Sequence, residues 1–126
     1  MKLNIITSTL NIDNVLSSES ISPESFYGKR SFGYKFFEAI PNVDFPKDRI
    51  VLFDYLPYID IVDDNRINYP VVLEIDDNNQ LCETVIQKEG DGVYSLDRTL
   101  YINPYNCRIL FFKIYDTFFF VYIFRF

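Results

Sequence analysis

From residue 49 onward the sequence consists of short apolar segments separated by turns rich in Asp, Asn, Gly and Pro. Apolar segments of four to eight residues between such turns are typical of β-strands and leave no room for a long helix. In this part of the chain we expect strands at Arg49–Tyr55, Tyr69–Ile75, Gln80–Gln87, Val93–Tyr94, Thr99–Asn103, Cys107–Tyr115 and Thr117–Phe126.

Three of these segments carry more specific signals. The four central residues of Arg49–Tyr55 are all apolar, which indicates burial on both faces of a sheet. The sequence DDNN separates Tyr69–Ile75 from Gln80–Gln87, and it predicts that these two strands form a hairpin. The last two strands flank a short Asp-Thr turn, and we expect them to pair as antiparallel neighbours.

The N-terminal part mixes one strand with short helices. Leu3–Thr7 is expected to be a strand, followed by a short helix that is capped by Thr9. A second short helix is predicted between Ser22 and Gly28, and residues 31–40 fit a strand slightly better than a helix. The predicted fold class is therefore α+β, mainly β, with an antiparallel sheet of about six or seven strands and one or two short N-terminal helices.

The length of 126 residues predicts a single domain, 1–126. The chain has no His, which excludes Ser-His-Asp and Cys-His catalysis and every His-ligated metal site. Its four Gly residues do not form a phosphate-binding loop. We therefore expect no cofactor and favour a protein without catalytic activity.

The cysteines and the apolar segments allow a prediction of the cellular compartment. Cys82 and Cys107 are too few for a structural zinc site, and no secretory signal precedes them, so we expect two buried, reduced thiols in the cytoplasm. The longest uncharged apolar segment, Thr117–Phe124, is too short to span a membrane. No membrane partner is expected.

Charge is concentrated in the middle of the chain. Residues 54–91 contain ten acidic and two basic side chains, a net charge of −8. This charge disfavours nucleic acid and favours a protein partner with a basic surface. Tyrosines beside aspartates are common at interfaces, and the predicted partner-binding residues are Asp54, Tyr55, Tyr58, Asp60, Asp63 and Asp64. Self-association through exposed strand edges is an alternative.

Clusters of acidic residues are also candidate metal ligands. Asp60, Asp63 and Asp64 lack the glycine and the alternate spacing of a calcium loop. Glu74 and Asp76 would share one face at a strand end, but no lysine follows at the spacing of a metal-dependent nuclease. We therefore predict no metal site and interpret both clusters as solvated turns.

A different class of function is suggested by the first thirty-four residues. The segment IITSTLNIDNVLSSESISP is similar to the start of ADP-ribosyltransferase-like domains over about twenty residues, although the His of their first strand is absent and no catalytic Glu can be assigned. The resemblance implies an alternative in which the chain is the N-terminal part of a nucleotide-binding enzyme. Its candidate binding residues are Tyr27, Arg30 and Tyr34.

Two further features of the sequence are its unusual composition and its apolar last segment. The abundance of Ile, Asn, Tyr, Phe and Asp is typical of AT-rich genes, and it suggests a bacterial mobile-element or phage-related system. The apolar segment FFFVYIFRF at the end of the sequence suits a strand inserted centrally into the sheet, a docking strand for a partner, or a fragment of a longer protein. The sequence leaves these three interpretations open.

Overall fold

In the computed structural model, residues 2–8, 11–27, 43, 46–58, 70–112 and 119–122 are described. Within them the strands are β1 (Lys2–Ser8), β2 (Ser20–Ile21), β3 (Ile50–Phe53), β4 (Pro70–Asp76), β5 (Gln87–Gly90), β6 (Val93–Leu96), β7 (Leu100–Tyr101), β8 (Cys107–Phe112) and β9 (Phe119–Tyr122). The helices are α1 (Ile12–Ser18) and the 3-10 helix η1 (Glu24–Tyr27).

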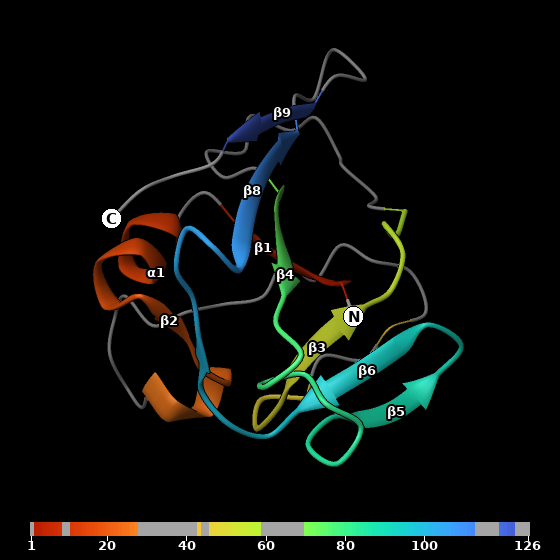
Figure 1. Ribbon diagram of the computed structural model, residues 1–126. Coiled ribbons are helices and arrows are strands. Elements are labelled where there is room, and N and C mark those ends of the chain that lie inside the picture. The colour runs from red at the N-terminus through yellow and green to blue at the C-terminus, as the bar shows by residue number, and fades with distance from the viewer. Residues whose placement is uncertain are drawn as a thin grey trace.

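Seven strands form one antiparallel sheet in the order β5-β6-β3-β1-β4-β8-β9, and β2 and β7 form a second, small sheet (Figure 1). The N-terminal strand β1 lies at the centre, paired with β4 over its whole length and with β3 on its other side. The predicted fold class, mainly β with short N-terminal helices, is confirmed.

Alternate residues of the central strands point to opposite faces of the large sheet and build two apolar clusters. The larger cluster lies on one face and includes Leu3, Leu52 and Leu73 of the sheet together with Val15 of α1. The smaller cluster on the other face contains Ile6, Val51, Phe53 and Val72. All four residues of β3 are buried, as their apolar run predicts.

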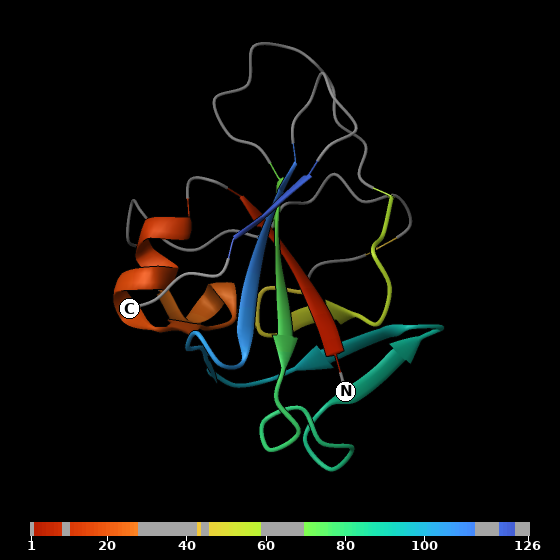
Figure 2. The ribbon, with the colours of Figure 1, turned by 45° about the horizontal axis from the view of Figure 1, so that its top comes forward.

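Helix α1 covers the first of these faces. Figure 2 shows α1 and η1 together on one side of the central strands. Ile12, Val15 and Leu16, spaced as the sequence predicts, contact the larger cluster. The N-cap position is occupied by Asn11 rather than by the predicted Thr9. The Asn11 side chain makes no capping bond, and its amide donates to the hydroxyls of Thr7 and Ser8.

The predicted hairpin between Tyr69–Ile75 and Gln80–Gln87 is wrong. Residues 78–86 form turns, and the next strand, β5, begins only at Gln87. The alternation that suggested a strand reflects burial of Leu81 and Ile86 in the larger cluster. Their backbone N–H groups donate to carbonyls a few residues earlier in the chain rather than to β4.

A group of polar side chains, the Asp77 network, replaces that hairpin. Asp77 accepts hydrogen bonds from the backbone N–H groups of Asn79 and Gln80 and from the side-chain amides of Gln80 and Asn106. The Gln80 amide also bonds both the N–H and the C=O of Tyr101. A side-chain amide thus occupies the place of a neighbouring strand along β7.

The ends of the large sheet differ. The strand β5 contains a bulge between Lys88 and Gly90, where the sequence predicted only a turn, and all four of its residues are exposed. A short, charged and bulged strand resists pairing with another chain. At the other end β9 pairs antiparallel with β8, as predicted, and among the described strands it lies at the edge of the sheet rather than at the centre.

The prediction of a strand over residues 31–40 lies outside the described residues.

No helix in the described part of the chain is long and apolar enough to cross a bilayer.

Candidate functional site

The strongest candidate for a functional site is the segment that follows β3. Asp54, Tyr55, Leu56 and Tyr58 are exposed there, and we call these four residues the Tyr55 surface. The side chains of Tyr55, Leu56 and Tyr58 are 45%, 44% and 75% exposed, respectively. Three large apolar side chains exposed within four residues are unusual for a chain that otherwise buries its apolar strands.

The backbone of this segment is fixed at several points. The N–H of Asp54 donates to the carbonyl of Gly92 over 2.9 Å, and the Asn4 amide donates to the carbonyl of Tyr55 over 3.0 Å. The Tyr55 ring packs edge-on against the buried Phe53, with ring centroids 5.7 Å apart. The start of the Tyr55 surface therefore projects from a backbone that is held at Asp54 and Tyr55, which lowers the entropy cost of binding there.

Sequence reasoning identified Asp54, Tyr55 and Tyr58 but missed Leu56. A signal was present, because Leu56 precedes a proline, and such a residue is disfavoured in a helix and common in turns. The anchoring role of Asn4 had no local signal, since fifty-one positions separate it from Tyr55. Asp60, Asp63 and Asp64, the other predicted partner-binding residues, lie outside the described residues.

The alternative nucleotide site is described only in part. Tyr27 is half-buried against the larger cluster, and its hydroxyl accepts a hydrogen bond from the N–H of Ser22. It therefore contributes to packing of η1. Arg30 and Tyr34 lie outside the described residues.

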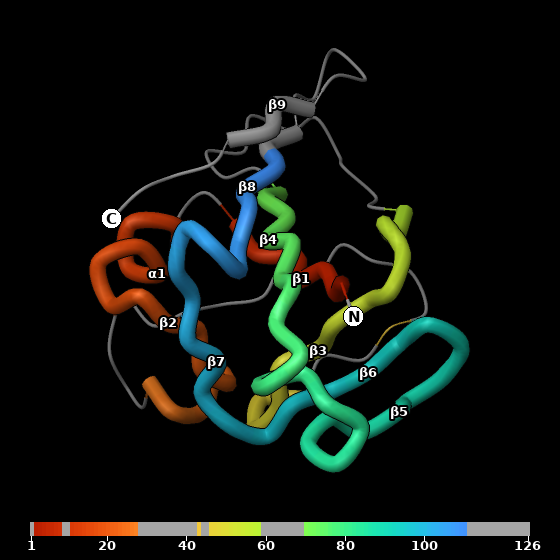
Figure 3. Tube along the Cα trace, viewed as in Figure 1, coloured from red at the N-terminus to blue at the C-terminus, as the bar shows by residue number. Residues whose placement is uncertain are grey.

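A second pair of exposed tyrosines lies elsewhere. Tyr101 and Tyr105 are 65% and 98% exposed, respectively. Figure 3 shows β7, which contains Tyr101, on the opposite side of the molecule from the chain that follows β3. Tyr105 lies in the turn that follows β7 and outside the Tyr55 surface, so it serves as a matched control for Tyr58.

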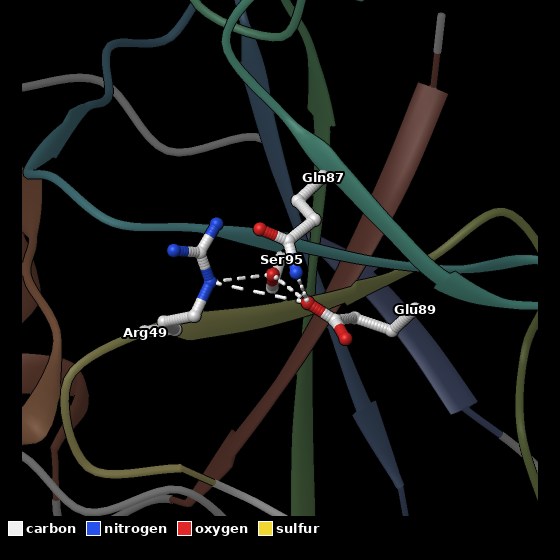
Figure 4. Close-up of polar contacts among 4 residues, drawn as sticks. All are labelled: Arg49, Gln87, Glu89 and Ser95. Atoms are coloured by element: carbon white, nitrogen blue, oxygen red, sulfur yellow. Dashed lines mark hydrogen bonds and ion pairs between the residues drawn. The ribbon is translucent and has the colours of Figure 1, made fainter.

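Four polar residues meet on the second face of the large sheet, and we call them the Ser95 network (Figure 4). Arg49 Nε donates to Ser95 Oγ over 2.6 Å, and Ser95 Oγ donates to Glu89 Oε1 over 2.6 Å. Gln87 donates to the same oxygen over 2.8 Å. Ser95 is completely buried, so its hydroxyl cannot reach a substrate. The network ties the β5–β6 hairpin to the start of β3.

We expect Ser95→Ala to lower the free energy of unfolding by about 1–3 kcal/mol, because Arg49 and Glu89 lose their shared hydroxyl partner. Urea denaturation followed by tyrosine fluorescence measures the change. The exposed Ser25 provides a matched control, and Ser25→Ala should change stability by less than about 0.5 kcal/mol. Equal effects of the two substitutions would contradict a stabilising role for the network.

The two cysteines lie in different environments, and both are free. Burial, together with the charge of Glu74, raises the pKa of Cys107 to about 12. A hydrogen bond with Thr84 lowers the pKa of Cys82 below its usual value. The prediction of two buried thiols is therefore right for Cys107 only, since Cys82 is partly exposed.

Thiol reactivity should follow these environments, because the thiolate is the reactive form. At about pH 8 a thiol reagent should modify Cys82 rapidly and leave Cys107 unmodified until the protein unfolds. Mass spectrometry of Cys82→Ser and Cys107→Ser variants measures each rate separately. Rapid modification of the folded Cys82→Ser variant would contradict the buried position of Cys107.

The acidic residues of the described segments form no cluster that could hold a metal ion. Glu74 is instead paired with Arg108, which donates to it through both Nε and Nη2. Asp77 belongs to the Asp77 network. These two carboxylates therefore have structural partners.

Comparisons with known proteins give no indication of function for this chain. No family model matches the chain, no curated protein matches it, and no solved structure matches it. Any function therefore rests on the described residues themselves.

Proposed function

We propose that this protein is a non-catalytic recognition protein that binds a basic protein partner through the Tyr55 surface. The single observation that carries the proposal is the exposure of Tyr55, Leu56 and Tyr58 in one segment whose backbone is held at Tyr55. Tyrosine provides a large contact area at small entropy cost, and it is enriched among the residues that dominate binding energy. The free thiols agree with a cytoplasmic location, which is part of the proposal.

Charge supports a basic partner. The described part of residues 54–91 carries seven acidic side chains and one lysine. Glu74 and Asp77 are held by Arg108 and by amide donors, but Asp54, Asp76 and Asp91 are exposed. An excess of exposed negative charge attracts a cationic partner over long distances and repels phosphate backbones.

Selection from a library of random dodecapeptides tests the proposal while the identity of the partner is still open. With the full chain as bait, we expect recovered peptides to be enriched in Lys and Arg. Their affinity should fall as salt is raised, because screening weakens attraction between exposed charges. Tyr58→Ser should weaken them at least about fivefold, since a tyrosine buried at an interface often contributes a kilocalorie or more per mole.

Tyr105→Ser is the matched control. It removes a tyrosine that is even more exposed, 98% against 75%, from the turn between β7 and β8, and it should leave affinity within about twofold. Recovery of no binding peptides would contradict the proposal. Peptides that bind equally well to the Tyr58→Ser variant would also contradict it.

A further inference from the structure

Within the Tyr55 surface, a carboxylate and an aromatic ring meet above one glycine. A Cβ atom added to Gly92 would lie 2.9 Å and 3.0 Å from two carbons of the Tyr55 ring, and still closer to Oδ1 of Asp54. Since both groups crowd the same side of one α-carbon, the carboxylate oxygen and the ring edge are neighbours. Gly92 also has φ +71°, a conformation that glycine adopts without strain.

This carboxylate is available to a ligand. Among the described residues, no side chain or backbone donor bonds to the Asp54 carboxylate, although its backbone N–H is bonded to Gly92. By contrast, the carboxylates of Glu74, Asp77 and Glu89 all accept hydrogen bonds from neighbouring side chains. Asp54 is thus an exposed anion beside a half-exposed ring on a fixed backbone.

We propose that the pair formed by Asp54 and Tyr55 accepts an arginine side chain of the basic partner. A guanidinium group is planar, donates two parallel hydrogen bonds to a carboxylate, and stacks on an aromatic ring. A lysine ammonium group lacks the flat face and the paired donors. The inference rests on the proposed function, because it names the partner side chain that the Tyr55 surface receives.

Titration with N-acetyl-arginine-N-methylamide, followed by ¹⁵N–¹H correlation spectra of the full chain, tests this inference directly. We expect saturable shifts concentrated at Asp54, Tyr55 and Gly92. A single side chain makes few contacts, so the dissociation constant should be on the order of 1–10 mM. The neutral, nearly isosteric citrulline derivative should cause no saturable shifts, because it lacks the charge that the carboxylate and the ring attract.

Two substitutions separate the specific contact from general charge. Asp54→Asn should weaken arginine binding at least about fivefold. Asp91→Asn removes the same charge from the exposed residue next to Gly92 and should change affinity less than about twofold. Equal effects of the two substitutions would overturn the inference. N-acetyl-lysine-N-methylamide is titrated in the same way. Equal binding of this lysine derivative, or of the citrulline derivative, would also overturn the inference.

The failure of this inference can be distinguished from failure of the proposed function. Suppose that the affinity of the selected basic peptides depends on Tyr58 but the arginine derivative causes no shifts at Gly92. The proposed arginine site is then wrong, whereas the proposed recognition surface is retained. If the arginine derivative binds but no peptide does, the proposed function is wrong.

Discussion

Phe53→Ala is expected to lower the free energy of unfolding by about 3–5 kcal/mol. Phe53 is completely buried and is the largest side chain of the smaller cluster, where it packs among the buried residues Ile6, Val51 and Val72. Removing the ring loses its transfer free energy and leaves a cavity between β-strands whose backbone positions are fixed by the sheet. Because Phe53 also supports the Tyr55 ring, the substitution should loosen the Tyr55 surface.

Urea denaturation followed by tyrosine fluorescence measures this loss, since the chain has ten Tyr and no Trp. Phe26→Ala is the matched control: the Phe26 side chain is 57% exposed, and its loss should cost less than about 0.5 kcal/mol. A Phe53→Ala variant that is as stable as the Phe26→Ala variant would show that the smaller cluster contributes little to the fold.

Asp77→Ala is expected to cost about 2–3 kcal/mol of stability. The carboxylate accepts four hydrogen bonds, and its removal leaves the amides of Gln80 and Asn106 without their shared acceptor. The neighbouring Asp76 is exposed, so Asp76→Ala should change stability by less than about 0.5 kcal/mol and serves as the control. Similar losses for the two variants would contradict the role of the Asp77 network.

The same network predicts a dependence on pH. Partial burial acts to raise the pKa of Asp77, but the hydrogen bonds from Gln80, Asn106 and Asn79 outweigh burial and bring the pKa below 3.8. A pKa that is lower in the folded chain gives stability that is present above the unfolded value and is lost as pH falls through the folded value. The stability difference between wild type and Asp77→Asn should therefore be complete above about pH 5 and shrink as the pH falls below about 4. A difference that stays constant over this range would contradict the lowered pKa.

The strands predicted from sequence were those whose burial is a local property. β1, β3, β4 and β8 appear where continuous apolar segments predicted them, because such segments can only be satisfied between two covered faces. The position of β1 between β3 and β4 was not predictable, since strand order depends on contacts between distant residues. Fold class could thus be predicted, and topology could not.

The segment after β4 shows why local pattern fails. Residues 80–87 alternate like a strand, but the side-chain amide of Gln80 bonds the backbone of Tyr101, twenty-one residues away. This contact, together with the turn at Asp77, stabilises a loop where the sequence favoured a hairpin. No feature within the segment itself indicates its distant partner.

The candidate site divides in the same way. Local pattern was enough to place Tyr55 and Tyr58 in an acidic turn region after a buried strand, because turn composition and strand burial depend on neighbouring residues. Two contacts could be seen only in the folded chain: the Asn4 amide holds the Tyr55 carbonyl, and the Asp54 carboxylate and the Tyr55 ring both lie against Gly92. Those contacts join positions far apart in the chain, and their geometry exists only once the sheet has assembled.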